Sequence, residues 1–136
     1  GHVLNYLPSR AALERALERA NKGDPRLVVI GDLNTMGLYF PTDRKADARV
    51  TADHELRALS EAAKAAGMRL LPKDRPATWA SWRSGMVCDL DHVIASDGLA
   101  IKSTVAVRGW HELEGSERKR FLTETSDHCS LALTVP

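Results

Sequence analysis

The sequence LVVIGDLN at residues 27–34 decides how this chain is expected to fold. Its first four residues are apolar and three of them are β-branched, which is typical of a buried strand. Gly31 ends the apolar run, and Asp32 and Asn34 follow two positions apart. In an extended chain this spacing directs both side chains to the same side. Because α/β folds commonly place functional groups where a buried strand ends, Asp32 and Asn34 are the first candidates for a site.

Two later stretches have a comparable character. LDHVI at 90–94 places Asp91 at the start of an apolar strand, and SDH at 126–128 places His128 before another. Taken singly, GDLN and SDH are each more typical of an ordinary polar turn at a strand end. We expect both to meet the GDLN turn in space, since Asp91 on one strand and His128 at the start of its neighbour are able to make contact. In such a contact an aspartate behind a histidine fixes the ring tautomer and stabilises its charged form. His92 follows Asp91, so its side chain is expected on the opposite face with a structural role.

The composition indicates one globular domain spanning residues 1–136, with 43% hydrophobic and 27% charged residues. The net charge of +1 selects no strongly charged partner. No apolar run reaches the length of a bilayer span and no signal peptide is visible, so a cytoplasmic location is expected. Cys88 and Cys129 lack metal-site spacing and are expected to be buried reduced thiols. If Asp91 and His128 meet, the two cysteines lie close together, and a disulfide between them is the alternative.

The order of elements predicts an α/β fold with a mixed sheet. Helices are predicted from apolar residues at helical spacing, and strands from apolar runs or alternation. The predicted helices span residues 10–21 and 52–66, and the predicted strands span residues 3–7, 27–30, 68–71, 87–95, 100–108 and 129–135. Residues 110–119 are charged and turn-like.

Four motifs taken together resemble a known family. They are GDLN (31–34), TWASWR (78–83), LDHVIAS (90–96) and SDHCSLALTV (126–135). Their order, approximate spacing and flanking hydrophobicity resemble the C-terminal half of the endonuclease/exonuclease/phosphatase superfamily. Its members are metal-dependent phosphodiesterases and phosphomonoesterases with the fold of DNase I. The resemblance extends from about Val3 to Val135.

The resemblance implies roles for five residues. Asp32 matches the acid that positions or deprotonates the attacking water, and Asn34 matches the amide that binds phosphate oxygens. His128 matches the histidine that faces the phosphorus, steadied by the carboxylate that Asp91 matches. Asp127 matches an acid near the metal, which the resemblance implies to be Mg²⁺ or Mn²⁺. In-line attack on a phosphodiester needs these types of group.

Two further clusters carry less weight. Trp79 and Trp82, beside Arg83, are able to stack on nucleic-acid bases, but large aromatic residues more often pack, and we expect packing beneath the site. The basic run at 118–120 is more typical of a solvated face than of a nucleic-acid patch.

The resemblance implies half of a DNase I-like four-layer sandwich, with one mixed sheet covered by two helices on one face. In the family, the first half supplies a phosphate-contacting Asn and a metal-binding Glu, which the residues before GDLN do not match. Asn5, Tyr6 and Leu7 stand where the family has a histidine. Because a large apolar sheet face is not left in water, we expect a homodimer that packs two sheets about a two-fold axis, or a separate chain that carries the first half.

Two functions remain open from the sequence. The first is a metal-dependent phosphodiester hydrolase that requires assembly for activity, with DNA or RNA as the default substrate. Phosphoinositides, sphingomyelin and nucleotide monoesters are also used within the family. The second is a catalytically inactive phosphate-binding or assembly module that retains the half-fold. The four motifs favour the first, and the unmatched Glu favours the second.

Overall fold

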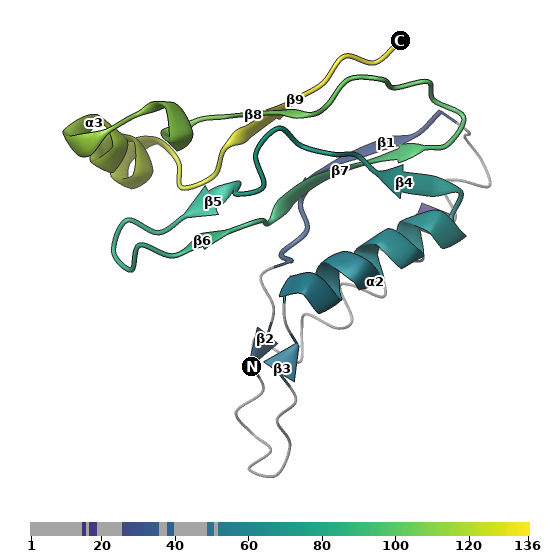
Figure 1. Cartoon of the computed structure of the whole chain (residues 1–136), viewed down its shortest axis with the longest axis horizontal. Helices are drawn as coiled ribbons and strands as arrows, with labels where there is room; N and C mark the ends of the chain where they lie inside the picture. Colours follow the sequence, from purple (N-terminus) through teal and green to yellow (C-terminus); the bar gives the residue numbers. More distant parts are fainter. Residues whose placement is uncertain (1–14, 16, 19–25, 36–37, 40–48, 51) are drawn as a thin grey trace.

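The computed structural model describes residues 15, 17–18, 26–35, 38–39, 49–50 and 52–136 (Figure 1). The strand predicted at 3–7 lies outside the described residues. Most of the helix predicted at 10–21 does so as well, although residues 15, 17 and 18 are helical. Within the described ranges, no helix combines the length and the apolar character that a bilayer crossing requires.

The centre of the fold is a three-stranded sheet. Strand β7 (Asp91–Ser96) lies between β1 (Val28–Asp32) and β4 (Met68–Leu70), and both pairings are antiparallel. All six residues of β7 are buried, including the polar Asp91, His92 and Ser96, as expected for a central strand with a partner on each edge. Asp32 is directly opposite Asp91 in the β1–β7 ladder. Two of the predicted site residues therefore meet at one end of the sheet.

The prediction of a mixed sheet is wrong for the central sheet, because β7 lies between the two parallel-running strands. Helix α2 (Ala52–Ala65) connects β1 to β4, and these two strands run parallel to each other, as in a βαβ unit. Strand β7 lies between them and runs the opposite way. In the described part of the chain, all pairs of named strands are antiparallel, and parallel pairing is limited to an isolated bridge between Lys73 and Val105. The element order hides this insertion, because the inserted strand comes later in the chain.

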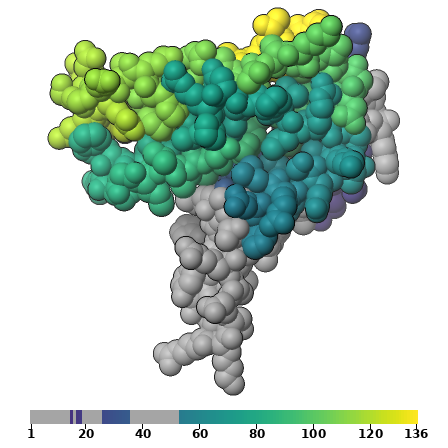
Figure 2. Space-filling view, viewed as in Figure 1, coloured from purple at the N-terminus to yellow at the C-terminus, as the bar shows by residue number. Residues whose placement is uncertain are grey.

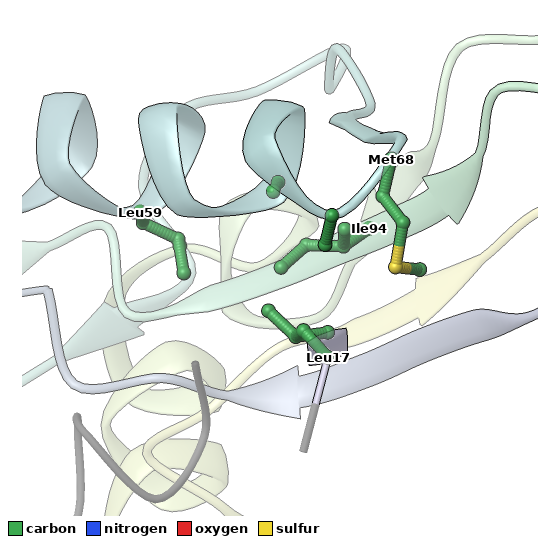
Figure 3. Packing of buried hydrophobic residues seen from close by; sticks show 6 residues of the cluster. Leu17, Leu59, Met68 and Ile94 are labelled. Carbon is green, nitrogen blue, oxygen red and sulfur yellow. The ribbon is translucent and has the colours of Figure 1, made fainter. Parts of the chain in front are cut away.

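Helix α2 covers one face of this sheet, as the spacing of its apolar residues predicts. Asp53 and Glu55 lie in its first turn, where negative charge favours a helix, and Lys64 lies in its last turn. Leu59 of α2 is fully buried against Met68 of β4 and Ile94 of β7 (Figure 3). The buried cluster also contains Leu17, Ala63 and Ala66. Leu17 belongs to the other predicted helix, so parts of both predicted helices contact this face.

The opposite face of the sheet is only partly covered. Val93 and Ala95 of β7 pack there with Val105, and Leu131 and Leu133 lie against the same cluster. Leu131 belongs to β9 (Ser130–Ala132), which pairs with β8 (Ala106–Arg108). The predicted strands at 100–108 and 129–135 are therefore shorter in the structure. Ile30 of β1 is still 50% exposed on this face, two residues before Asp32.

A hairpin and a helical segment lie side by side at one end of the molecule, on the left side of Figures 1 and 2. The hairpin pairs β5 (Trp79–Ala80) with β6 (Val87–Cys88). The helical segment consists of the 3₁₀ turn η1 (Trp110–Glu112), helix α3 (Gly115–Arg120) and a turn of π type, η2 (Phe121–Thr125). The charged stretch predicted to be turn-like is therefore largely helical. Elsewhere β2 (Leu38–Tyr39) pairs with β3 (Arg49–Val50).

Candidate active site

The strongest feature of the site is the contact between Asp91 and His128. Nδ1 of His128 lies 2.9 Å from Oδ2 of Asp91, the first residue of the buried strand β7. The aspartate side chain is 11% exposed and the histidine side chain 32%, so the ring is reachable while its partner is sheltered. A carboxylate at Nδ1 holds the proton on that nitrogen and orients Nε2 for other contacts. The expected meeting of these two segments is confirmed.

Asp32 lies on the other side of the same ring. Its Oδ2 is 4.0 Å from Nε2 of His128, so the imidazole has a carboxylate near each nitrogen. Partial burial by itself lowers the pKa of His128. The hydrogen bond to Asp91 and the negative charges of Asp91, Asp32 and Asp127 outweigh burial, and the net pKa is raised above the ordinary histidine value. The protonated ring is therefore favoured at this position.

Thr78 holds the two halves of this contact together. Its buried hydroxyl oxygen accepts hydrogen bonds from the backbone N–H groups of Leu90 (3.0 Å) and Asp91 (2.9 Å). Its carbonyl oxygen accepts from the backbone N–H of Cys129 at 2.7 Å. One residue thus places the start of β7 and the segment after His128. The sequence assigned no role to this threonine of the TWASWR motif. In the structure its buried hydroxyl holds the start of β7 in place.

Asn34 does not have the extended conformation that was predicted to direct its side chain to the same side as that of Asp32. Its backbone N–H donates to Oδ1 of Asp32 at 2.8 Å, and its φ of 52° lies in the left-handed region that asparagine tolerates. Strand β1 therefore ends at Asp32. At residue 34 the extended chain that was expected is replaced by a turn, which the hydrogen bond to the Asp32 side chain closes. The exposed Asn34 lies two residues after Asp32 in the sequence, and its contact with phosphate remains a prediction.

A comparison with protein families fits this arrangement. The model of the Endonuclease/Exonuclease/phosphatase family matches residues 5–128, most of the chain. The chain belongs to the endonuclease/exonuclease/phosphatase family. Comparisons with curated proteins and with solved structures found no match. Membership of this family supports a domain of the nuclease and phosphatase class, as the four motifs predicted.

For a member of the endonuclease/exonuclease/phosphatase family, the sequence predicted a metal near Asp127. Oδ2 of Asp127 accepts a hydrogen bond from Nε1 of Trp79 at 2.9 Å. Among the described residues, no three His, Cys, Asp or Glu side chains form a group able to hold a metal ion. Mg²⁺ requires a near-octahedral oxygen shell, to which proteins often contribute one or two carboxylates. The described residues do not complete such a site by themselves.

The prediction that Trp82 packs beneath the site is wrong. The residue is 44% exposed in the loop of the β5–β6 hairpin, which extends beyond the central sheet at the left of Figure 1. Nζ of Lys119 lies 5.7 Å from the centre of its ring. A hollow beside it is lined by Arg83 and reaches Asp127. Trp79, by contrast, is half-buried and takes part in the contact with Asp127.

The basic run at 118–120 is only partly a solvated face. Arg118 is half-buried, and its guanidinium lies 4.6 Å from the ring centre of Trp110. Arg120 is exposed and pairs with Glu124 at 3.0 Å. Only part of this run therefore follows the sequence prediction.

The two cysteines fit the prediction of reduced thiols. Neither forms a disulfide. Cys129 is buried and Cys88 half-buried, and burial raises the pKa of both thiols. Both are therefore poor nucleophiles at neutral pH.

His92 also lies where the sequence predicted. It is 1% exposed on the face of β7 opposite Asp91, and burial, with the charge of Lys73, lowers its pKa. Its hydrogen-bond partners include Lys73 and Thr35, two residues that sequence reasoning did not single out. A lysine after an ordinary strand carries no sequence signal for such a contact.

Proposed function

We propose that this chain hydrolyses phosphodiesters at the site formed by Asp32, Asp91 and His128. The observation that supports it is the imidazole held by Asp91 at Nδ1, with its Nε2 4.0 Å from Asp32. Hydrolysis forms a bond from a water oxygen to phosphorus and breaks the bond to the leaving oxygen. It needs a group that takes a proton from the water and donors for the charge on the phosphoryl oxygens.

Each residue has one part in this reaction. Asp32 is exposed and positions the attacking water or accepts its proton. His128 has a raised pKa, so its protonated ring donates from Nε2 to a phosphoryl oxygen. Asp91 keeps the other ring proton on Nδ1 and thereby orients the ring. The amide of Asn34 donates to a second phosphate oxygen.

Metal dependence belongs to this proposal, with Mg²⁺ or Mn²⁺ as the ion. Asp127 is the carboxylate of this chain proposed to hold it. Such an ion polarises the phosphoryl group and neutralises its charge. The described side chains do not complete its shell, so the remaining oxygen atoms come from water, substrate phosphate, a second polypeptide or residues of this chain outside the described ranges.

The test is hydrolysis of bis-p-nitrophenyl phosphate with Mg²⁺ or Mn²⁺ and without metal. We expect metal-dependent activity that His128→Ala abolishes. The matched control is His54→Ala, since His54 is an exposed histidine of α2. Activity that survives His128→Ala contradicts the proposal.

A second candidate function is a catalytically inactive module that binds phosphate or serves assembly. The observation that favours it is the incomplete set of metal donors among the described residues. In that case no hydrolysis occurs, and neither Mg²⁺ nor Mn²⁺ shifts the melting temperature. Phosphate binding measured by calorimetry then separates a phosphate-binding module from an assembly module.

Nucleic acid is the proposed substrate, and the surroundings of Trp82 support it. An exposed indole with Lys119 near its ring and Arg83 beside it suits a base that stacks and a backbone that carries negative charge. We expect Trp82→Ala to raise the KM for single-stranded DNA or RNA and to leave the KM for bis-p-nitrophenyl phosphate unchanged. Equal effects on both substrates contradict this assignment.

Assembly is the last part of the proposal. The partner is a second copy of this chain, or a separate chain that carries the first half of the family fold. The exposed Ile30, on the face opposite the helices and next to Asp32, suits a partner surface beside the site. Size-exclusion chromatography with light scattering distinguishes the two. A dimer that Ile30→Asp dissociates supports the first, and a monomer that becomes active only with a second chain supports the other. A fully active monomer contradicts both.

A further inference from the structure

A buried polar cluster lies behind the proposed site, on the other face of β7 from His128. It consists of Thr35, Lys73, Asp89 and His92. Thr35 is fully buried, and the side chain of Lys73 is 7% exposed. A lysine is rarely buried to this degree without partners, because its ammonium loses hydration. None of these four residues has a part in the proposed reaction.

The ammonium of Lys73 has three acceptors. It forms an ion pair with the carboxylate of Asp89. It also donates to the backbone carbonyl of Asp91 at 2.6 Å, and lies 3.2 Å from Nδ1 of His92. An ammonium has three N–H groups and accepts no hydrogen bond. Its donors are therefore all used, and two of the three acceptors belong to the first two residues of β7.

These contacts determine the tautomer of His92. Because Lys73 only donates, Nδ1 of His92 must accept, and the ring proton is on Nε2. That proton is directed at Oγ1 of Thr35, 2.6 Å away, with the carbonyl oxygen of Asp89 at 3.3 Å. The hydroxyl of Thr35 in turn donates to the carbonyl of Asp89 at 2.5 Å. The result is a continuous chain of hydrogen bonds from Lys73 through His92 to Thr35.

This chain joins segments that carry different parts of the site. Thr35 directly follows Asn34 in the turn after β1, and Asp89 and His92 flank Asp91. The backbone N–H of Leu33 donates to the carbonyl of Leu90 at 2.8 Å, so the same two segments also touch through their backbones. Any loosening between them changes the separation of Asp32 from Asp91.

We propose that Lys73 is a positioning residue, whose buried ammonium holds the turn at 32–35 against the start of β7, so that Asp32 and Asp91 stay in place around His128. This role rests on the proposed function, since it matters for catalysis only if these carboxylates act. Small displacements of a reacting group reduce rates strongly, and contacts behind catalytic groups commonly have large effects on activity.

The experiment uses the full chain with two variants and one control. Lys73→Met removes the ammonium but leaves Asp89 without its ion-pair partner. Thr35→Val keeps both charges and removes only the hydroxyl at the end of the chain. The control is Lys102→Met, because Lys102 is an exposed lysine. Two quantities are measured, the kinetics with bis-p-nitrophenyl phosphate and the amide hydrogen exchange of single residues.

We expect both variants to lower kcat by about 10- to 100-fold while KM changes by less than about twofold, since a positioning contact does not bind substrate. Exchange at the amide of Leu33 should become at least about tenfold faster. Exchange at the amide of Ala66, which donates to the carbonyl of Ala62 at the end of α2, should be unchanged. This amide precedes β4, whose Met68 pairs with Ser96 at the other end of β7 from His92. The control should match the wild type in both quantities.

Three outcomes overturn the inference. One is equal acceleration at Leu33 and Ala66, which indicates global destabilisation. Another is unchanged exchange at Leu33, and the third is faster local exchange with unchanged kcat. If the wild-type chain hydrolyses nothing, the proposed function fails, whereas the exchange at Leu33 still decides whether Lys73 holds the turn against β7.

Discussion

Asp32 and Asp91 lie directly opposite each other in the β1–β7 ladder, and the imidazole of His128 contacts both carboxylates from outside the sheet. Neighbouring antiparallel residues direct their side chains to the same face. Two like charges so placed repel each other unless a cation lies between them. A positive charge on the His128 ring offsets this repulsion, and the nearby carboxylates accordingly raise the pKa of His128.

Removing the charge of Asp91 should change the pH dependence of the reaction. Asp91→Asn takes away the hydrogen bond and the nearest negative charge, so the pKa of His128 should fall. If the protonated ring is the active form, the decline of kcat at high pH should move to lower pH. The pH–rate profile and the NMR titration of His128 check this. A titration that is identical in both proteins contradicts the prediction.

The same pKa shift makes stability depend on pH. The folded pKa of His128 is above its unfolded value, so its contribution to stability is fully present below the unfolded pKa. That contribution is lost as the pH rises through the folded pKa. The difference in unfolding free energy between wild type and His128→Ala should therefore be larger at about pH 5 than at about pH 9. Urea unfolding at both pH values measures it, and the opposite order contradicts it.

Asp32→Asn should reduce activity far more than stability. The residue is exposed, so its replacement leaves no buried group without a partner. A general base contributes a factor of about 100 to 10,000 to a rate, which sets the expected loss in kcat. Asp97→Asn is a matched control at another exposed aspartate, and its kcat should be that of the wild type. Comparable losses in both variants exclude a specific role for Asp32.

Thr78→Val should destabilise the fold. The substitution keeps the shape but leaves the backbone N–H groups of Leu90 and Asp91 without their acceptor in a buried place. Each such group costs about 1–3 kcal/mol of unfolding free energy. Thr78→Ser keeps the oxygen and is the control, with a smaller loss. Chemical denaturation measures both, and a loss in Thr78→Val no larger than that in Thr78→Ser contradicts the role given to the hydroxyl.

Leu59→Ala tests the helix-covered core apart from the site. The side chain is fully buried against Met68 and Ile94, so its truncation should cost about 2–5 kcal/mol of unfolding free energy. The neighbouring Ser60 is exposed, and Ser60→Ala should stay within about 0.5 kcal/mol of the wild type. Thermal or urea unfolding checks both values. A Leu59 variant as stable as the Ser60 variant contradicts the described core.

The amino-acid sequence by itself determined helix α2, the strand before GDLN and the four motifs that identify the family. Apolar spacing, turn residues and strand ends are local properties, so they can be read without knowing which segments pair. It also predicted that Asp32, Asp91 and His128 meet, because the family resemblance carries that proximity. The opposite orientation of His92 follows from strand alternation alone.

Only the tertiary structure decided the features that depend on distant segments. Strand β7 lies between β1 and β4, Thr78 accepts two hydrogen bonds from the start of β7, and Lys73 is buried behind Asp91. The exposure of Trp82 likewise depends on where its hairpin projects. The identity of a threonine, a lysine or a tryptophan in the sequence does not determine whether its side chain is buried or which residues it contacts. Burial and partners are set by which strands pair, and that choice depends on the free energy of the whole fold.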